Sequence, residues 1–221
     1  MLIIFDLDDT LIDTSGSVTP VQLTRAIDML AGKGVIFRNQ QEALDVLLRL
    51  NQTAPSARHA LAEFFEITGI DDSLMPLAHD LVYYNIPDNI VVEAHYRAVE
   101  ILQSLSEIHK LVLVTIGRED LQLLKLKKAG IDSDIFSKIV VTPVKNKKIH
   151  YQSIVDEFDV DPSEVLVCGD RISIDLSPAK ELGCRTVQML AGRGIHCRGD
   201  KSHVDYVISN LSEIIKILSE V

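Results

Sequence analysis

Cysteine is scarce in this chain of 221 residues, which has three: Cys168, Cys184 and Cys197. An odd number of cysteines, with none of the spacings that bind a metal, argues against a disulfide framework. The sequence also lacks a basic leader followed by an apolar segment, and no apolar run is long enough to cross a bilayer. We therefore expect a protein of the reducing cytoplasm that is neither exported nor inserted into a membrane.

Positive charge is in deficit, because 22 Lys and Arg face 32 Asp and Glu and the formal net charge is −10. Nucleic-acid polymers and anionic membrane surfaces are bound by clustered basic residues, so neither is expected as a main partner. A small ligand or a metal ion remains open. The sequence contains no signal for an oligomeric state.

Glycine and proline, at 11 and 7 residues, are too few for a collagen-like or low-complexity chain. No segment recurs at the period of a solenoid or a propeller. Apolar residues make up 47% of the chain, which is enough for a sizeable hydrophobic core. We expect one globular domain, or one domain that carries a smaller insertion.

Short apolar runs alternate with amphipathic helical patterns in the second half of the chain, which is typical of strand–helix–strand units. The predicted fold class is therefore α/β, with a Rossmann-like, doubly wound parallel sheet. The last of the predicted strands is expected at an edge of the sheet. The predicted strands are Leu2–Phe5, Leu111–Thr115, Ile139–Thr142, Glu164–Val167, Thr186–Met189 and Tyr206–Ile208.

Residues 16–88 differ from the rest, because they contain several helical patterns in succession and no convincing strand. They predict an all-helical domain inserted into an α/β core domain made of residues 1–15 and 89–221. The segment 85–88 is the expected return linker. The predicted N-caps of the four helices are Thr19, Asn39, Ser56 and Asp72.

Polar residues follow four of the predicted strands, at the end where ligands bind in doubly wound sheets. Because the carboxyl ends of parallel strands meet at one edge, we expect these residues to lie near one another. They are Asp6 and Asp8 with Thr10; Thr115, Ile116 and Gly117; Lys145; and Gly169 and Asp170 with Asp175.

Asp6 and Asp8 stand two residues apart at a strand end, so their side chains are expected on the same side. Two carboxylates that close, joined by Asp170 from a neighbouring strand, need compensating positive charge. A hard cation supplies it, and Mg²⁺ prefers oxygen ligands while taking others from water or substrate. The sequence therefore predicts a Mg²⁺ site and an anionic substrate, most often a phosphate.

Donors for such an anion follow the other strands. The Thr115 hydroxyl, the amides after it and the Lys145 ammonium together suit an anion with several oxygens. Phosphoryl transfer needs an in-line nucleophile, a proton donor for the leaving oxygen and cations around the phosphoryl group. The sequence supplies each of these.

With these motifs in this order, the chain resembles the haloacid dehalogenase (HAD) superfamily of hydrolases over nearly its whole length. The helical insertion also stands where that family commonly carries a cap, between its first and second motifs. The matching motifs are DxDxT at Asp6, Asp8 and Thr10; a Thr after a strand at Thr115; a Lys before a helix at Lys145; and GDxxxxD at Gly169, Asp170 and Asp175.

The resemblance implies a role for each of these residues. Asp6 would be the nucleophile that forms an aspartyl-phosphate, and Asp8 would be the general acid and base. Mg²⁺ would be held by Asp6, Asp170 and the backbone carbonyl of Asp8, while Asp175 would orient Lys145 or a metal-bound water. Phosphoryl oxygens would be held by Thr115, Ile116 and Gly117.

The lysine of the third motif is ambiguous, because three lysines stand close together. We prefer Lys145 for its spacing to Tyr151 and to the following strand. Lys148 is the alternative, although it is expected to lie already on the next helix. Lys147 is expected to be solvated and without a role.

The acid at position 8 favours phosphoryl transfer over dehalogenation within this family, since a halide leaving group needs no proton. The predicted function is Mg²⁺-dependent hydrolysis of a small phosphate monoester, with a small phosphorylated metabolite as partner. A phosphomutase of the same superfamily shares all four motifs and is one alternative. A non-catalytic regulator that binds a phosphorylated ligand is another.

Overall fold

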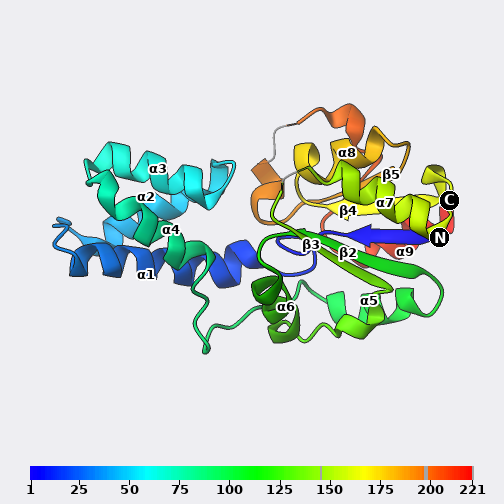
Figure 1. Ribbon diagram of the computed structural model, residues 1–221, viewed down its shortest axis with the longest axis horizontal. Helices are drawn as coiled ribbons and strands as arrows, with labels where there is room; N and C mark the ends of the chain where they lie inside the picture. Colours follow the sequence, from blue (N-terminus) through cyan, green and yellow to red (C-terminus); the bar gives the residue numbers. More distant parts are fainter. Residues whose placement is uncertain (145, 197–198, 221) are drawn as a thin grey trace. The chain divides into compact units, whose positions relative to one another are not determined.

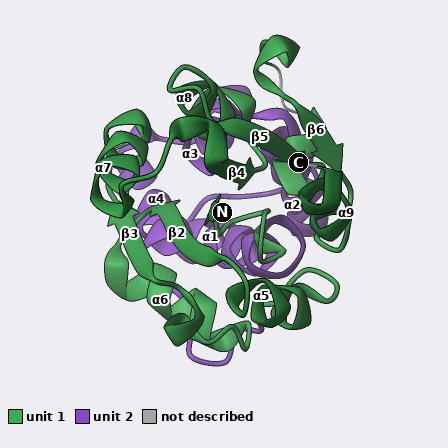
Figure 2. Ribbon diagram, turned by 90° about the vertical axis from the view of Figure 1, so that its right-hand side faces the viewer, with its two compact units in different colours: residues 1–14, 92–221 green, residues 15–91 purple. Residues whose placement is uncertain are grey.

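The computed structural model describes residues 1–144, 146–196 and 199–220. The chain divides into two compact units, residues 1–14 with 92–221 and residues 15–91, which Figure 2 shows in green and purple. Residues 16–88, which the sequence indicates as a helical insertion, lie within the second unit. Each unit has its own hydrophobic core.

The first unit is built on a six-stranded parallel sheet, with strand order β3-β2-β1-β4-β5-β6. The predicted α/β fold with a doubly wound parallel sheet is confirmed, and β6 is an edge strand as expected. Observed and predicted strand ends differ by two residues at most. The strands are β1 (Leu2–Phe5), β2 (Lys110–Ile116), β3 (Lys138–Thr142), β4 (Val165–Gly169), β5 (Arg185–Met189) and β6 (Tyr206–Ile208).

Helices cover both faces of this sheet, so strands β1 and β4 are buried on both sides. Helices α5 (Ala98–Ser106) and α6 (Glu119–Lys128) lie on one face (Figure 1). Helices α7 (Lys148–Phe158) and α8 (Ser177–Lys180) lie on the other, and α9 (Glu213–Glu220) follows β6. The core under α7 and α8 includes Ile4, Val112, Val114, Tyr151, Ile154, Val155, Val167 and Ala179.

Short helical turns occur in both units. Two of them, η1 and η5, are π-type turns, and the others are 3₁₀ turns. They are η1 (Thr14–Val18), η2 (Asp72–Leu74), η3 (Ser133–Ile135), η4 (Pro162–Glu164), η5 (Ile172–Leu176), η6 (Gly192–His196) and η7 (Lys201–His203).

Strand order places a topological switch point at β1, because the chain builds outward through β2 and β3 and then returns to β4 on the other side. Phe5 pairs with Leu113 of β2 and with Cys168 of β4. The Asp6 amide continues the ladder and donates to the Cys168 carbonyl at 3.0 Å. The residues that follow β1 and β4 therefore lie next to each other at this edge.

The second unit contains four α-helices that pack around an apolar core of their own. They are α1 (Thr19–Gly32), α2 (Gln40–Thr53), α3 (Ala57–Thr68) and α4 (Met75–Tyr83). An apolar stripe on each helix faces this core. The core includes Leu23, Ile27, Leu30, Leu47, Leu61, Phe64 and Phe65.

Two of the four predicted N-caps stand at the predicted position. Asn39 precedes α2, and its side chain accepts from the amides of Gln41 and Glu42, as expected. Ser56 precedes α3, but its hydroxyl pairs with the His59 ring at 2.7 Å and makes no cap hydrogen bond to an amide.

The other two cap predictions are wrong. The chain enters α1 directly from η1, so Val18 already has helical dihedrals and Thr19 is the first residue of the helix. Before α4, the capping side chain is Asp71, which accepts from the Ser73 amide at 2.8 Å, while Asp72 begins the short turn η2. Within the described part of the chain, no helix combines the length and the apolar character that crossing a membrane requires.

Candidate active site

Four of the predicted site residues lie at the carboxyl edge of the sheet around β1. Asp6 directly follows β1, Thr115 lies in β2, and Asp170 directly follows β4. Asp175 lies in the turn η5, one turn further along the chain than Asp170. All four residues are buried, which removes the solvent that would screen their charges and dipoles.

A buried lysine joins two of these carboxylates. The Lys147 ammonium donates to Asp6 Oδ1 at 2.6 Å, to Asp175 Oδ1 at 2.6 Å and to the Val114 carbonyl at 2.8 Å. An ammonium has three protons, so this group is fully satisfied. The Lys147 side chain is 0% exposed, and the two carboxylates raise its pKa although burial alone would lower it.

The expectation that Lys147 is solvated is therefore wrong. Lys147 is the residue before α7, where the chain turns from the sheet edge into the helix, and this turn sends its side chain inward. Lys148 is the first residue of α7, as expected, and it forms a surface ion pair with Glu181 at 2.7 Å. Lys145, the preferred candidate from the sequence, lies outside the described residues.

Burial decides the protonation equilibrium of Asp6. It raises the pKa of Asp6 to about 6, because the Lys147 ammonium only partly offsets it and the nearby Asp175 carboxylate adds to the shift. Burial also raises the pKa of Asp170 well above its ordinary value, again with a contribution from Asp175. Both carboxylates need more positive charge than the described side chains supply.

The donor set at this edge fits a hard divalent cation. Carboxylate oxygens of Asp6, Asp170 and Asp175 lie within 4.8 Å of one another. Asp6 Oδ2 and Asp170 Oδ1 are buried and accept no hydrogen bond from the described residues, although Arg171 Nε is 3.7 Å from the latter. All-oxygen sets with open positions suit Mg²⁺. These residues therefore fit the predicted Mg²⁺.

Asp175 differs from the other two members of this trio, because both of its oxygens are already bonded. Oδ1 accepts from Lys147, and Oδ2 accepts from the Arg171 amide at 3.0 Å. Gly169 permits this close approach, since a Cβ there would lie 2.5 Å from the Asp175 Cβ. The geometry therefore suits Asp175 to positioning Lys147, and it leaves Asp6 Oδ2 and Asp170 Oδ1 open to a cation.

Asp8 lies in a different environment, two residues further along and 27% exposed. Its Oδ1 accepts from Lys125 at 2.8 Å and from Thr14 at 2.5 Å, and its Oδ2 accepts from Gln122 at 2.9 Å and from Lys125 at 3.1 Å. Burial alone would raise the pKa of Asp8, but Lys125 and these hydrogen bonds lower it to about 2. These contacts therefore favour the ionised form of Asp8.

Gln122 and Lys125, which contact Asp8, were not predicted from the sequence. Both lie on α6, the helix that follows the strand of Thr115, and they stand three residues apart on one helical face. Gln122 also donates to Thr115 Oγ1 at 2.6 Å. A buried Gln on a helix rich in exposed charge was the available signal, but burial cannot be read from so weakly amphipathic a pattern.

The segment predicted to hold phosphoryl oxygens is partly engaged within the protein. The Gly117 amide donates to the Thr142 carbonyl at 2.9 Å, so it is not free for a substrate in this structure. Gly117 instead makes room for Gln122, since a Cβ would lie 3.0 Å from its Cγ and Cδ. Ile116 ends β2 beside Thr142. Thr115 keeps a hydroxyl proton to donate, because Gln122 is the donor in their contact.

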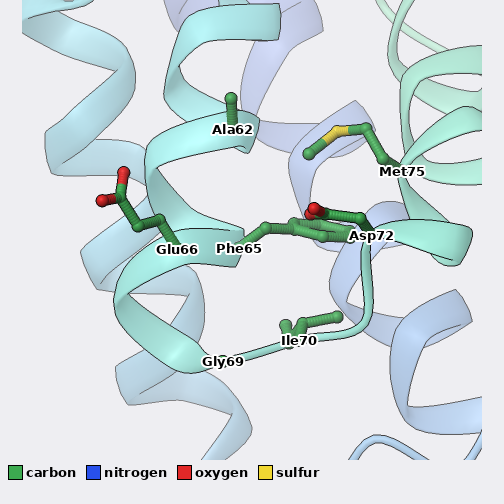
Figure 3. A pocket seen from close by; sticks show the side chains of 7 residues that line it. All are labelled: Ala62, Phe65, Glu66, Gly69, Ile70, Asp72 and Met75. Atoms are coloured by element: carbon green, nitrogen blue, oxygen red, sulfur yellow. The ribbon is translucent and has the colours of Figure 1, made fainter.

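A pocket of about 470 Å³ lies within the helical unit, between α3 and the turn that leads into α4 (Figure 3). The only charged side chains among its lining residues are acidic, so it would repel a phosphate ester. The candidate active site therefore remains at the sheet edge. The pocket is lined by Ala62, Phe65, Glu66, Gly69, Ile70, Asp72 and Met75.

The family model for haloacid dehalogenase-like hydrolases matches residues 1–183. The chain therefore belongs to the haloacid dehalogenase-like hydrolase family, as the resemblance indicated. This match spans all four motifs and the whole helical unit. It ends before β5.

Curated relatives of the chain are phosphatases. It is 25% identical over 225 residues to glyceraldehyde 3-phosphate phosphatase of Pyrococcus furiosus, covering 98% of this chain and 92% of that protein. It is 26% identical over 223 residues to the protein of the same name from Methanocaldococcus jannaschii, covering 98% and 96%. The predicted enzyme class, a HAD-type phosphatase, is confirmed at the level of these comparisons.

Solved structures show the same fold. A predicted phosphoglycolate phosphatase from Haemophilus somnus superimposes with a TM-score of 0.75 at 17% identity, over 98% of this chain and 97% of that one. A HAD phosphatase from Thermococcus onnurineus gives a TM-score of 0.65 at 24% identity, over 98% and 97%.

Proposed function

We propose that the protein is a Mg²⁺-dependent phosphatase that hydrolyses a small phosphate monoester through an aspartyl-phosphate on Asp6. The observation that carries this proposal is the buried Asp6–Lys147–Asp175 cluster beside an Asp170 oxygen that no described donor satisfies. The names of the relatives favour a small phosphorylated metabolite, with glyceraldehyde 3-phosphate the first to test. The helical unit is proposed to select the leaving group.

In the first step, an Asp6 oxygen attacks the phosphorus and the ester oxygen leaves as an alcohol after taking a proton from Asp8. Lys147 fixes Asp6 through Oδ1 and supplies one positive charge. The Thr115 hydroxyl is free to donate to a phosphoryl oxygen, because its contact with Gln122 uses its acceptor side. Mg²⁺ held by Asp6 and Asp170, when bound, supplies the remaining positive charge for the phosphoryl oxygens.

In the second step, water attacks the phosphorus of the aspartyl-phosphate and gives a proton to Asp8. Inorganic phosphate leaves, and Asp6 returns as a carboxylate. Asp8 must therefore be ionised in this step and protonated in the first. The contacts with Lys125, Thr14 and Gln122 stabilise the ionised form that the second step requires.

The predicted cytoplasmic location is part of this proposal. Cys168 and Cys184 are both free and buried, as expected of thiols in a reducing compartment. The third cysteine, Cys197, lies outside the described residues. The proposed substrate is likewise a metabolite of the cell interior.

Release of inorganic phosphate tests the proposal. The purified protein is incubated with p-nitrophenyl phosphate and with a metabolite panel that includes glyceraldehyde 3-phosphate, with Mg²⁺ or with EDTA. We expect phosphate release with Mg²⁺, its loss with EDTA, and its loss in Asp6→Asn. Asp45→Asn, on the exposed side of α2, is the control. Activity that survives Asp6→Asn would contradict the proposed nucleophile, and an isomerised sugar phosphate without free phosphate would indicate a mutase.

A further inference from the structure

Two side chains of helix α6 contact the functional groups of separate motifs. We propose that Gln122 and Lys125 are positioning residues that hold the Asp8 carboxylate and the Thr115 hydroxyl as one hydrogen-bonded unit for the proton-transfer steps. This inference rests on the proposed function and adds to it a second lysine, Lys125, which serves Asp8 as Lys147 serves Asp6.

The contacts around Asp8 fix the orientation of its carboxylate. Each of its two oxygens accepts two hydrogen bonds, one of them from Lys125 in both cases. Thr14 completes the set on Oδ1 and Gln122 completes it on Oδ2. Four hydrogen bonds from three side chains leave the carboxylate one orientation, which is what a group that delivers and accepts a proton in one place requires.

The contacts of Gln122 fix the direction of a second group. A carboxylate can only accept, so Gln122 presents its NH₂ to Asp8. The same nitrogen lies 2.6 Å from Thr115 Oγ1, which must therefore act as the acceptor. The Thr115 hydroxyl proton then points away from Gln122 and is available to a phosphoryl oxygen.

Packing alone does not explain these two residues. Gln122 is 3% exposed, at a site where an apolar side chain would fill the space without a polar group to satisfy. Gly117 leaves the space that Gln122 occupies. Lys125 turns inward to Asp8, whereas Lys127 on the same helix is exposed. Gln122 Nε2 and the Lys125 ammonium donate to Asp8, and Gln122 Nε2 also donates to Thr115.

The test separates proton transfer from phosphate binding by the choice of leaving group. Nitrophenolate leaves readily without a proton, whereas the alkoxide of glycerol phosphate needs one. Because Asp8 also serves the second step, which is the same for every substrate, the first step is measured alone, as alcohol release in a single turnover with the protein in excess. Lys125→Met removes the ammonium that pairs with Asp8. We expect its first-step rate to fall about 10–10²-fold for glycerol phosphate, with the half-saturating concentration unchanged, and to change by less than about threefold for p-nitrophenyl phosphate. Lys125→Arg should recover part of the loss.

Gln122→Met removes contacts to both groups, so we expect the same leaving-group dependence together with a raised KM for both substrates. Lys127→Met is the matched control and should behave like the wild type. The thermal midpoint of each variant, measured in parallel, identifies loss through unfolding, and Lys125, being partly exposed, is the more tolerant position.

Equal losses of the first-step rate on both substrates in folded variants, or no loss on either, would overturn the positioning role while leaving the proposed function intact. A wild-type protein that releases no phosphate from these two substrates or from any member of the metabolite panel would overturn the proposed function itself, and this inference with it.

Discussion

The first motif supplies the aspartates of two aspartate–lysine pairs, and these pairs lie in different environments. Asp6 with Lys147 is buried, with side chains 2% and 0% exposed, whereas Asp8 with Lys125 is 27% and 13% exposed. Burial raises the pKa of Asp6 to about 6. Burial acts in the same direction on Asp8, but Lys125 and the surrounding hydrogen bonds lower its pKa to about 2.

The difference teaches that the partners of a carboxylate, more than its residue type or position in a motif, set its protonation. Lys147 is shared between Asp6 and Asp175, so its charge is divided. Among the described residues, the Lys125 ammonium forms an ion pair with Asp8 alone, and it contacts both carboxylate oxygens. Asp6 therefore needs a further cation, whereas the negative charge of Asp8 is already balanced by Lys125.

Removing Lys147 should have the largest effect. Lys147→Met leaves Asp6 and Asp175 buried without their cation, so we expect the free energy of unfolding to fall by about 3–5 kcal/mol. Activity should fall by at least about 10²–10³-fold. Urea denaturation and phosphate release measure both effects.

Lys148→Met and Lys145→Met are the controls for that variant. Lys148 pairs with Glu181 on the surface, so its loss should change little. A large loss in Lys145→Met with a normal Lys147→Met would restore the assignment preferred from the sequence.

Neutralising Asp170 should stabilise the metal-free protein and abolish its stabilisation by Mg²⁺. Asp170→Asn removes a buried charge that no described donor satisfies, so we expect the metal-free protein to be stabilised by about 1–2 kcal/mol. Mg²⁺ raises the thermal midpoint of a protein whose folded form alone binds it, so the wild type should respond and the variant should not. Thermal melts with Mg²⁺ and with EDTA give this result directly. An unchanged Mg²⁺ response in Asp170→Asn would remove Asp170 from the metal site.

The two aspartates should also give opposite pH dependences in the metal-free protein. The raised pKa of Asp6 contributes stability below its ordinary value of 3.8 that is lost as the pH rises through about 6. The lowered pKa of Asp8 contributes stability above 3.8 that is lost as the pH falls through about 2.

The free energy of unfolding of Asp6→Asn and of Asp8→Asn is measured at each pH by denaturation. Subtracting each value from that of the wild type isolates the contribution of the aspartate. Each difference should amount to about 2–3 kcal/mol, with the Asp6 curve falling between pH 4 and pH 6 and the Asp8 curve rising between pH 2 and pH 4. Two curves of the same slope would refute the contrast between the pairs.

The smallest effect is expected at Thr14, which supplies one of the four hydrogen bonds to Asp8. Thr14→Val keeps the shape and removes the donor, so we expect a loss of about 0.5–1.5 kcal/mol in stability. Activity should fall by only a few-fold, because Lys125 and Gln122 remain. Thr14→Ser retains the hydroxyl and should match the wild type in both assays; a Ser variant as impaired as Val would assign the effect to packing.

The strands could be predicted because short apolar runs mark buried parallel strands. The group of site residues could be predicted because the polar residues that follow such strands meet at one edge of the sheet. The structure accordingly brings Asp6, Asp170 and Asp175 together. The roles of these residues stay predictions until activity is measured. The caps of α1 and α4 could not be predicted, because the backbone before each helix is already turned.

The lysine partners could not be assigned from the sequence for a related reason. Lys147 and Lys148 are neighbours, yet one is buried and the other exposed, because the local turn into α7 decides which side chain points inward. Lys125 and Gln122 reach Asp8 across more than a hundred residues of chain, and that contact exists only once β1 and β2 pair. Such contacts are tertiary and leave no local pattern.

The nucleophile is tested most directly by acid-quenching the protein during turnover with a good substrate and mapping its peptides by mass spectrometry. The proposed chemistry predicts one phosphoryl group on the peptide that contains Asp6, absent in Asp6→Asn. Turnover that leaves this peptide unmodified at every quench time, or a phosphoryl group found on another residue, would contradict it.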